Sequence, residues 1–83
     1  ADNPHTPLHQ TIVGDATCNL TYTTDSPGHA SIISPPRGNL NQTGDLSLQY
    51  RPHPGDKSDR YIIEVCDDAG CNTITYTVTI SIE

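Results

Sequence analysis

Residues 73–83 read TITYTVTISIE, and this run decides the fold. Its apolar and hydroxyl side chains alternate at every second position, which places them on opposite faces of an extended chain. Thr, Ile, Val and Tyr also favour β-strands, so residue propensity agrees with the pattern. We therefore predict a strand whose inward face carries Ile74, Tyr76, Val78, Ile80 and Ile82.

The stretch just upstream supplies a partner for this strand. Residues 60–66 read RYIIEVC, with Tyr61, Ile63 and Val65 on one face. The connecting residues 67–70 read DDAG, and a four-residue loop that ends in glycine suits a type I turn. We expect the two strands to form an antiparallel hairpin.

The rest of the chain predicts further short strands and no helix. No window places apolar residues at i, i+3, i+4 and i+7, and the chain contains seven prolines. The additional strands are expected at residues 11–13, 18–24, 30–34 and 44–52, with turns at 37–40 and 52–58. This spacing favours a β-sandwich of six or seven strands. Residues 1–10 are interpreted as an N-terminal tail or linker, and residues 11–83 as a single domain.

Composition limits both the core and the partners. Only 33% of the residues are hydrophobic, Phe, Trp and Met are absent, and four tyrosines are the only aromatic residues. A core of this size leaves no room for a deep substrate cleft. The formal net charge of −6 argues against nucleic acid or an anionic membrane surface as a partner, because both require a basic patch. No apolar run approaches the ~20 residues of a membrane span.

The alternation of inward and outward side chains assigns each of the three cysteines to one face of its strand. Cys66 and Cys71 fall on the outward side of their strands, at the mouth of the same turn. A disulfide between them is reasonable if they are directly opposed, and it would stabilise the domain by about 2 kcal/mol. Cys18 has the opposite parity and is interpreted as a buried, unpaired thiol. An immunoglobulin-type bridge across the sandwich and an intermolecular disulfide are the alternatives for Cys18.

Metal binding through cysteine is not expected. Zinc sites need four soft ligands, usually supplied as two such cysteine pairs. This chain has no second pair, and its four histidines are scattered over the tail and loops. No resident cofactor is expected.

Four motifs in order resemble a known family. They are Ser34-Pro35-Pro36-x-Gly38-x-Leu40, Tyr50-Arg51-Pro52, Asp59-Arg60-Tyr61 and Val65-Cys66-Asp67, and the series covers residues 30–82, nearly two-thirds of the chain. The series resembles the cadherin-like, immunoglobulin-like repeat domains of bacterial secreted and cell-surface proteins. The resemblance implies a Greek-key β-sandwich of about seven short strands with a spacer, adhesion or accessory role.

The N-terminal third departs from that family. Many such repeats carry a stretch rich in Asp and Asn that coordinates calcium. Here the corresponding region offers only Asp15, Asp25 and Gly28, well separated in the sequence.

The sequence predicts no catalytic residue. It contains no G-x-S-x-G, no H-E-x-x-H and no glycine-rich phosphate loop. The resemblance implies, in agreement with this, a non-catalytic module of a larger secreted or cell-surface protein. Its expected partners are the neighbouring domains of that protein, and the isolated module is expected to be a monomer.

A ligand-binding module is the alternative function. Calcium requires several converging oxygen ligands, and Asp67 and Asp68 could join Asp25, Asp56 or Asp59 if the loops meet at one end of the sandwich. A surface glycan or a protein ligand is a further candidate partner. All four tyrosines fall on predicted inward faces, which weakens the case for a sugar-binding platform.

Overall fold

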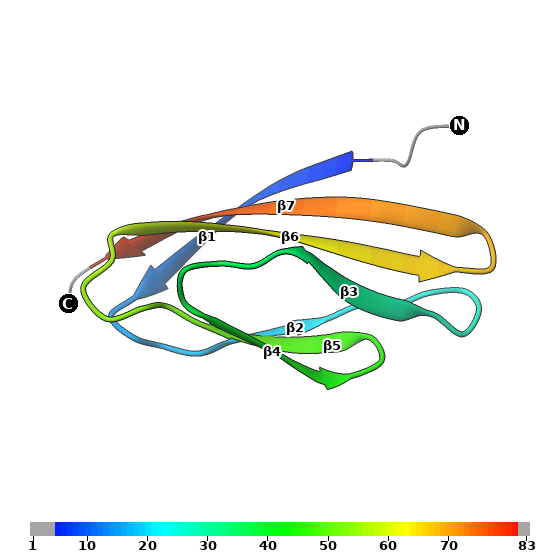
Figure 1. The fold of residues 1–83 in the computed structure, drawn as a ribbon, viewed down its shortest axis with the longest axis horizontal. Coiled ribbons are helices and arrows are strands. Elements are labelled where there is room, and N and C mark those ends of the chain that lie inside the picture. The colour runs from blue at the N-terminus through cyan, green and yellow to red at the C-terminus, as the bar shows by residue number, and fades with distance from the viewer. Residues whose placement is uncertain (1–4, 82–83) are drawn as a thin grey trace.

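The computed structural model describes residues 5–81, which form two packed β-sheets and contain no helix (Figure 1). No segment of these residues is therefore a helix able to cross a membrane. Each strand is short to medium in length, and the connections are turns and loops. The strands are β1 (His5–Val13), β2 (Cys18–Thr21), β3 (His29–Ser34), β4 (Asn39–Gly44), β5 (Ser47–Arg51), β6 (Ser58–Asp67) and β7 (Gly70–Ser81).

The larger sheet has the strand order β1-β7-β6-β3, and the smaller has the order β2-β5-β4. β1 is parallel to β7, whereas the other pairs are antiparallel. Both β1 and β7 begin near the β6–β7 turn and end at the opposite end of the sandwich, where Val13 pairs with Ser81 (Figure 1). The described chain therefore runs along the long axis, from His5, which pairs with Thr73 three residues into β7, to Ser81 at the far end.

The predicted hairpin is present, and the alternation along β7 sets its inward face. Ile74, Tyr76, Val78 and Ile80 are buried, whereas Ile82 lies outside the described residues. Thr77 and Thr79 are exposed on the outer face, as expected. Thr75 also faces outward but is buried, because Pro7 of β1 and Ile62 of β6 flank it in register.

The structure differs from the sequence prediction at residues 5–10. They were expected to belong to the tail, but they pair with β7 as the first part of β1. Leu8, Gln10 and Ile12 share the inward side with Tyr76, Val78 and Ile80. β1 is an edge strand that pairs only with β7, and an edge strand needs few apolar residues. The sequence of residues 5–10 is therefore polar and resembles that of a linker. Residues 1–4 of the predicted tail lie outside the described residues.

A second difference concerns residues 39–44. They form β4 rather than a simple turn, and they pair with β5. β4 is an edge strand whose side chains are mostly exposed, so it lacks the apolar alternation that reveals a strand in sequence. The strand predicted at 18–24 is shorter, since β2 ends at Thr21.

Tyrosine rings form the centre of the core. The rings of Tyr50 and Tyr61 lie 4.8 Å apart, and those of Tyr61 and Tyr76 lie 4.7 Å apart. Their hydroxyls are also partnered: Tyr61 donates to Gln10 Oε1 at 2.7 Å, and the Tyr22 and Tyr76 oxygens lie 2.7 Å apart. Burial raises the pKa of all four tyrosines, which keeps them neutral. Tyrosine thus supplies the aromatic volume that the missing Phe and Trp would otherwise provide.

Candidate functional site

A buried carboxylate joins the two sheets near one end of the sandwich. Asp59, on β6, is 8% exposed. Its carboxylate accepts hydrogen bonds from the backbone N–H of Arg37 at 3.0 Å, of Gly38 at 3.0 Å and of Arg60 at 2.8 Å. The hydroxyl of Tyr50, on β5 of the other sheet, donates a fourth at 2.6 Å. Three of the four sequence motifs therefore meet at one side chain.

The surroundings of Asp59 keep it ionised. Burial alone would raise the pKa of this carboxyl, but the hydrogen bonds from Tyr50 and from the three backbone N–H groups outweigh it and lower the pKa. Gly38 is required for this geometry, because a Cβ at that position would collide with the carbonyl oxygen of Arg51. All four donors are fixed parts of the fold, so the contacts of Asp59 are those of a structural residue.

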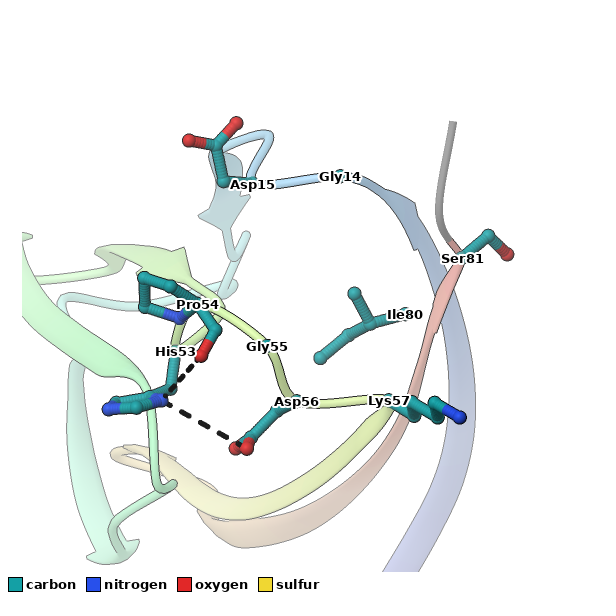
Figure 2. A pocket seen from close by; sticks show the side chains of 9 residues that line it. All are labelled: Gly14, Asp15, His53, Pro54, Gly55, Asp56, Lys57, Ile80 and Ser81. Atoms are coloured by element: carbon teal, nitrogen blue, oxygen red, sulfur yellow. Dashed lines mark hydrogen bonds and ion pairs between the residues drawn. The ribbon is translucent and has the colours of Figure 1, made fainter.

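A pocket of about 410 Å³ opens at the same end of the molecule (Figure 2). The Gly14–Asp15 turn, the loop 53–57 and the end of β7 surround it, with Ile80 on one wall. His53 Nδ1 lies 3.0 Å from the carbonyl oxygen of Pro54 and 4.0 Å from Asp56 Oδ1. The imidazole is thus turned toward its own loop, as Figure 2 shows.

Ion pairs neutralise most of the charge around this pocket. Arg37 Nε lies 3.4 Å from Asp56 Oδ2, and Arg51 donates to Asp15 Oδ2 at 3.1 Å. Asp56 Oδ2 is buried and makes no hydrogen bond among the described residues. Its partner is the guanidinium of Arg37. The charged side chains that line the pocket are Asp15, Asp56 and Lys57, and both aspartates are paired with arginine.

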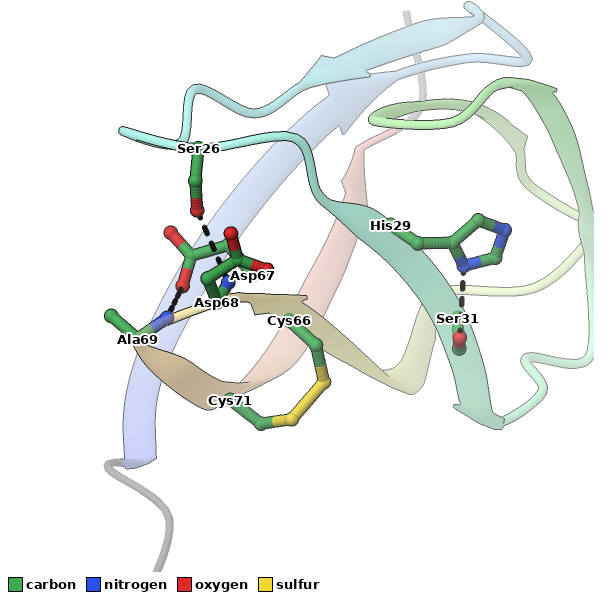
Figure 3. Close-up of a disulfide and its surroundings, with 8 residues drawn as sticks. All are labelled: Ser26, His29, Ser31, Cys66, Asp67, Asp68, Ala69 and Cys71. Atoms are coloured by element: carbon green, nitrogen blue, oxygen red, sulfur yellow. Dashed lines mark hydrogen bonds between the residues drawn. A yellow bond between two sulfur atoms is a disulfide. The ribbon is translucent and has the colours of Figure 1, made fainter.

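The opposite end of the molecule carries the disulfide between Cys66 and Cys71 (Figure 3). The two residues are directly paired across the β6–β7 hairpin, with their Cα atoms 4.0 Å apart. Beyond the disulfide, the backbone N–H of Ala69 donates to Asp67 Oδ1 at 2.9 Å, which closes the turn. The disulfide predicted from side-chain parity is present in the structure.

Cys18 is a free thiol in the structure. It is half-buried, packs against the core and receives a hydrogen bond from the Gln10 amide at 3.5 Å. A bridge from Cys18 to Cys66 is not formed, because Cys66 is already bonded to Cys71.

The carboxylates considered for calcium are divided between the two ends of the sandwich. Asp25 lies at the same end as Asp67 and Asp68, because its neighbour Ser26 accepts a hydrogen bond from the Asp68 N–H at 3.1 Å. Asp56 and Asp59 lie at the start of β6, and Asp67 and Asp68 lie at its end. At about 3.3 Å per residue, a strand of this length separates the two pairs by roughly 30 Å. Within residues 5–81, the only three metal-binding side chains that converge are Glu64, Cys66 and Cys71. The multi-carboxylate site that the alternative function requires is therefore not formed by the described residues.

Sequence reasoning missed the position of Glu64. The alternation in residues 60–66 places Glu64 on the outward face of its strand, together with Cys66. The signal that would have found this group is the directly opposed pairing of Cys66 and Cys71, which places Glu64 beside both sulfur atoms.

Comparisons with known proteins show the fold alone. No protein-family model matches the chain, and no curated protein is similar enough to be counted as a relative. A 2,6-sialyltransferase from a Vibrionaceae Photobacterium species aligns with 96% of this chain, at a TM-score of 0.61 and 13% identity. An endo-fucoidan hydrolase of glycoside hydrolase family 107 aligns with 98% of it, at a TM-score of 0.59 and 15% identity. This chain spans only 18% and 13% of those two proteins, respectively.

Proposed function

We propose that this chain is a non-catalytic, extracellular β-sandwich module that serves as a spacer, adhesion or accessory domain of a larger secreted or cell-surface protein. The observation that carries the proposal is the placement of the two ends of the described chain. β1 and β7 run parallel along a body whose long axis is 42 Å, so the described chain enters toward the β6–β7 end and leaves at the other. A module of this kind extends its parent by its own length and holds the flanking domains apart.

The strand order supports an immunoglobulin-like, Greek-key form of the sandwich. In immunoglobulin-type sandwiches, the second, fifth and fourth strands share one sheet, and the third, sixth and seventh share the other. The sheets β2-β5-β4 and β7-β6-β3 have this composition, with β1 added beside β7. The convergence of three motifs on Asp59 gives the proposed likeness to bacterial cadherin-like repeats a physical basis.

The chemistry of the surface supports an extracellular location. A disulfide closes the exposed hairpin, and disulfides persist mainly in oxidising compartments. The matched region also makes up less than a fifth of two larger carbohydrate-active proteins, which is the size relation expected of an accessory domain.

The assembly state and cooperativity of the chain test this proposal. We expect sedimentation velocity to give a monomer and thermal unfolding to show one cooperative transition, because the core and the Asp59 contacts lie within the chain. A chain that stays unfolded until a partner is added would contradict an autonomous module. Turnover of a glycoside substrate that survives removal of contaminating enzymes would contradict the non-catalytic role.

A further inference from the structure

We propose that reduction of the Cys66–Cys71 disulfide converts the outer face of the hairpin into a zinc site, with the two thiolates, the Glu64 carboxylate and the His29 imidazole as ligands. The ligand atoms of Glu64, Cys66 and Cys71 already lie within 4.8 Å of one another. Zinc binds cysteine sulfur at about 2.3 Å and carboxylate oxygen at about 2.0–2.2 Å, so one ion can be reached from all three.

Sheet register supplies the fourth ligand. His29 on β3 pairs with Cys66 on β6, and Cys66 pairs with Cys71 on β7. Directly opposed residues on neighbouring strands point to the same face, with Cβ atoms about 5 Å apart. The three side chains therefore form a row across the outer face, and Glu64 stands two residues along the middle strand on the same face.

The imidazole of His29 has to turn from its present rotamer toward the sulfur atoms in order to coordinate the metal. Its Nδ1 lies 3.3 Å from Ser31 Oγ in an exposed hydrogen bond, and Figure 3 shows the ring turned toward Ser31 and away from the sulfur atoms. A long, solvent-exposed hydrogen bond contributes little to stability, so coordination to a metal ion can replace it.

The four groups match the chemistry of zinc. Two thiolates, one imidazole and one carboxylate supply the four ligands of a tetrahedral zinc site. Zinc accepts sulfur, nitrogen and oxygen ligands of these kinds. The sequence alone suggested no such set, because it offers only one cysteine pair. The fold adds the missing two ligands from the neighbouring strand and from the same strand face.

The redox step is balanced by a thiol reductant. Two thiol molecules reduce the Cys66–Cys71 bond to two thiols and are themselves oxidised to one disulfide. Zinc then binds both sulfur atoms as thiolates and releases two protons. In the oxidised protein the sulfur atoms are bonded to each other, so the disulfide keeps the site closed.

Cobalt binding tests the site directly. Co²⁺ is added to the reduced chain in a Cys18→Ser background, which removes the only other thiol. We expect the visible absorption of tetrahedral, thiolate-ligated Co²⁺, which stoichiometric Zn²⁺ abolishes, and no such absorption from the oxidised chain. Absence of a tetrahedral spectrum from the folded, reduced chain would overturn the proposal.

Substitution of the two non-sulfur ligands separates this site from loose binding by a thiol pair. We expect Glu64→Gln and His29→Ala each to weaken zinc binding by at least the roughly tenfold that loss of an outer-shell partner costs. Asp68→Asn is the matched control, because Asp68 is an exposed acid on the same hairpin outside the ligand group. Unchanged affinity in either ligand variant would overturn the assigned ligand set.

If reduction loosens the fold, thermal unfolding gives a second measurement of zinc binding. A ligand that binds only the native state raises the unfolding midpoint. We expect zinc to raise the midpoint of the reduced chain, and to raise it less in the Glu64→Gln and His29→Ala variants. A midpoint that zinc leaves unchanged would count against the site, while the proposed role as a module would stand.

Discussion

Removal of one hydroxyl should show how strongly the Asp59 contacts hold the two sheets together. Tyr50→Phe keeps the ring that stacks 4.8 Å from Tyr61 but removes the 2.6 Å hydrogen bond to Asp59. A hydrogen bond to a charged group contributes about 1.5–3 kcal/mol. We therefore expect the free energy of unfolding to fall by about 2 kcal/mol, a large share of the stability of so small a domain.

The effect should depend on pH in a defined direction. The folded-state pKa of Asp59 is lowered, so its contribution is complete above the unfolded pKa of about 3.9 and is lost as pH falls through the lower folded value. Tyr50→Phe raises the folded pKa toward that of the unfolded chain. The difference between wild type and variant should therefore be full at neutral pH and shrink below about pH 4.

Urea unfolding followed by far-ultraviolet circular dichroism measures both quantities. Tyr76→Phe is the matched control, because it removes a hydroxyl whose partner at 2.7 Å is the neutral Tyr22. This control should cost about 1 kcal/mol with no change across the acid range. A loss below about 0.5 kcal/mol in Tyr50→Phe, or the same loss at pH 3 and pH 7, would refute the role assigned to the Asp59 carboxylate.

Three further perturbations test other parts of the structure. Reduction of the Cys66–Cys71 disulfide should lower the free energy of unfolding by about 2 kcal/mol, because the closed loop is short, and should raise the number of alkylatable thiols from one to three in denatured protein; an unchanged thiol count would show that the bond had not formed. Gly38→Ala should destabilise the domain by roughly 1–3 kcal/mol in urea unfolding, since the new methyl group meets the Arg51 carbonyl oxygen; full stability would mean that the loop relaxes freely. Millimolar calcium should leave the thermal midpoint of the oxidised chain unchanged, because the described carboxylates do not converge; a clear rise would restore the calcium-binding alternative.

The strands that bury an apolar face could be predicted from the sequence. The alternation in residues 73–81 and in 61–65 follows directly from burial on one side of a sheet, and the parity that it sets placed Cys66 and Cys71 together. The edge strands could not be predicted in the same way. β4 is almost wholly exposed, and the first half of β1 is held by backbone pairing to β7, which leaves little trace in composition.

The candidate sites were only partly predictable for a similar reason. Asp59, Tyr50 and Gly38 stood out as separate motifs, but their meeting depends on the packing of β5 on β6 and on a loop from β3 to β4. His29 and Glu64 carried no motif, because a site formed across three strands leaves no fixed spacing in the sequence.

Small-angle X-ray scattering from two copies fused in series measures whether the module separates its neighbours along its long axis. Each copy keeps its own terminal residues as the connection. We expect a maximum dimension about twice the 42 Å axis of one module, because β1 and β7 run parallel along that axis and the chain enters toward the β6–β7 end and leaves at the other. A maximum dimension close to that of a single copy would mean that the two modules fold back side by side, and it would contradict the spacer role.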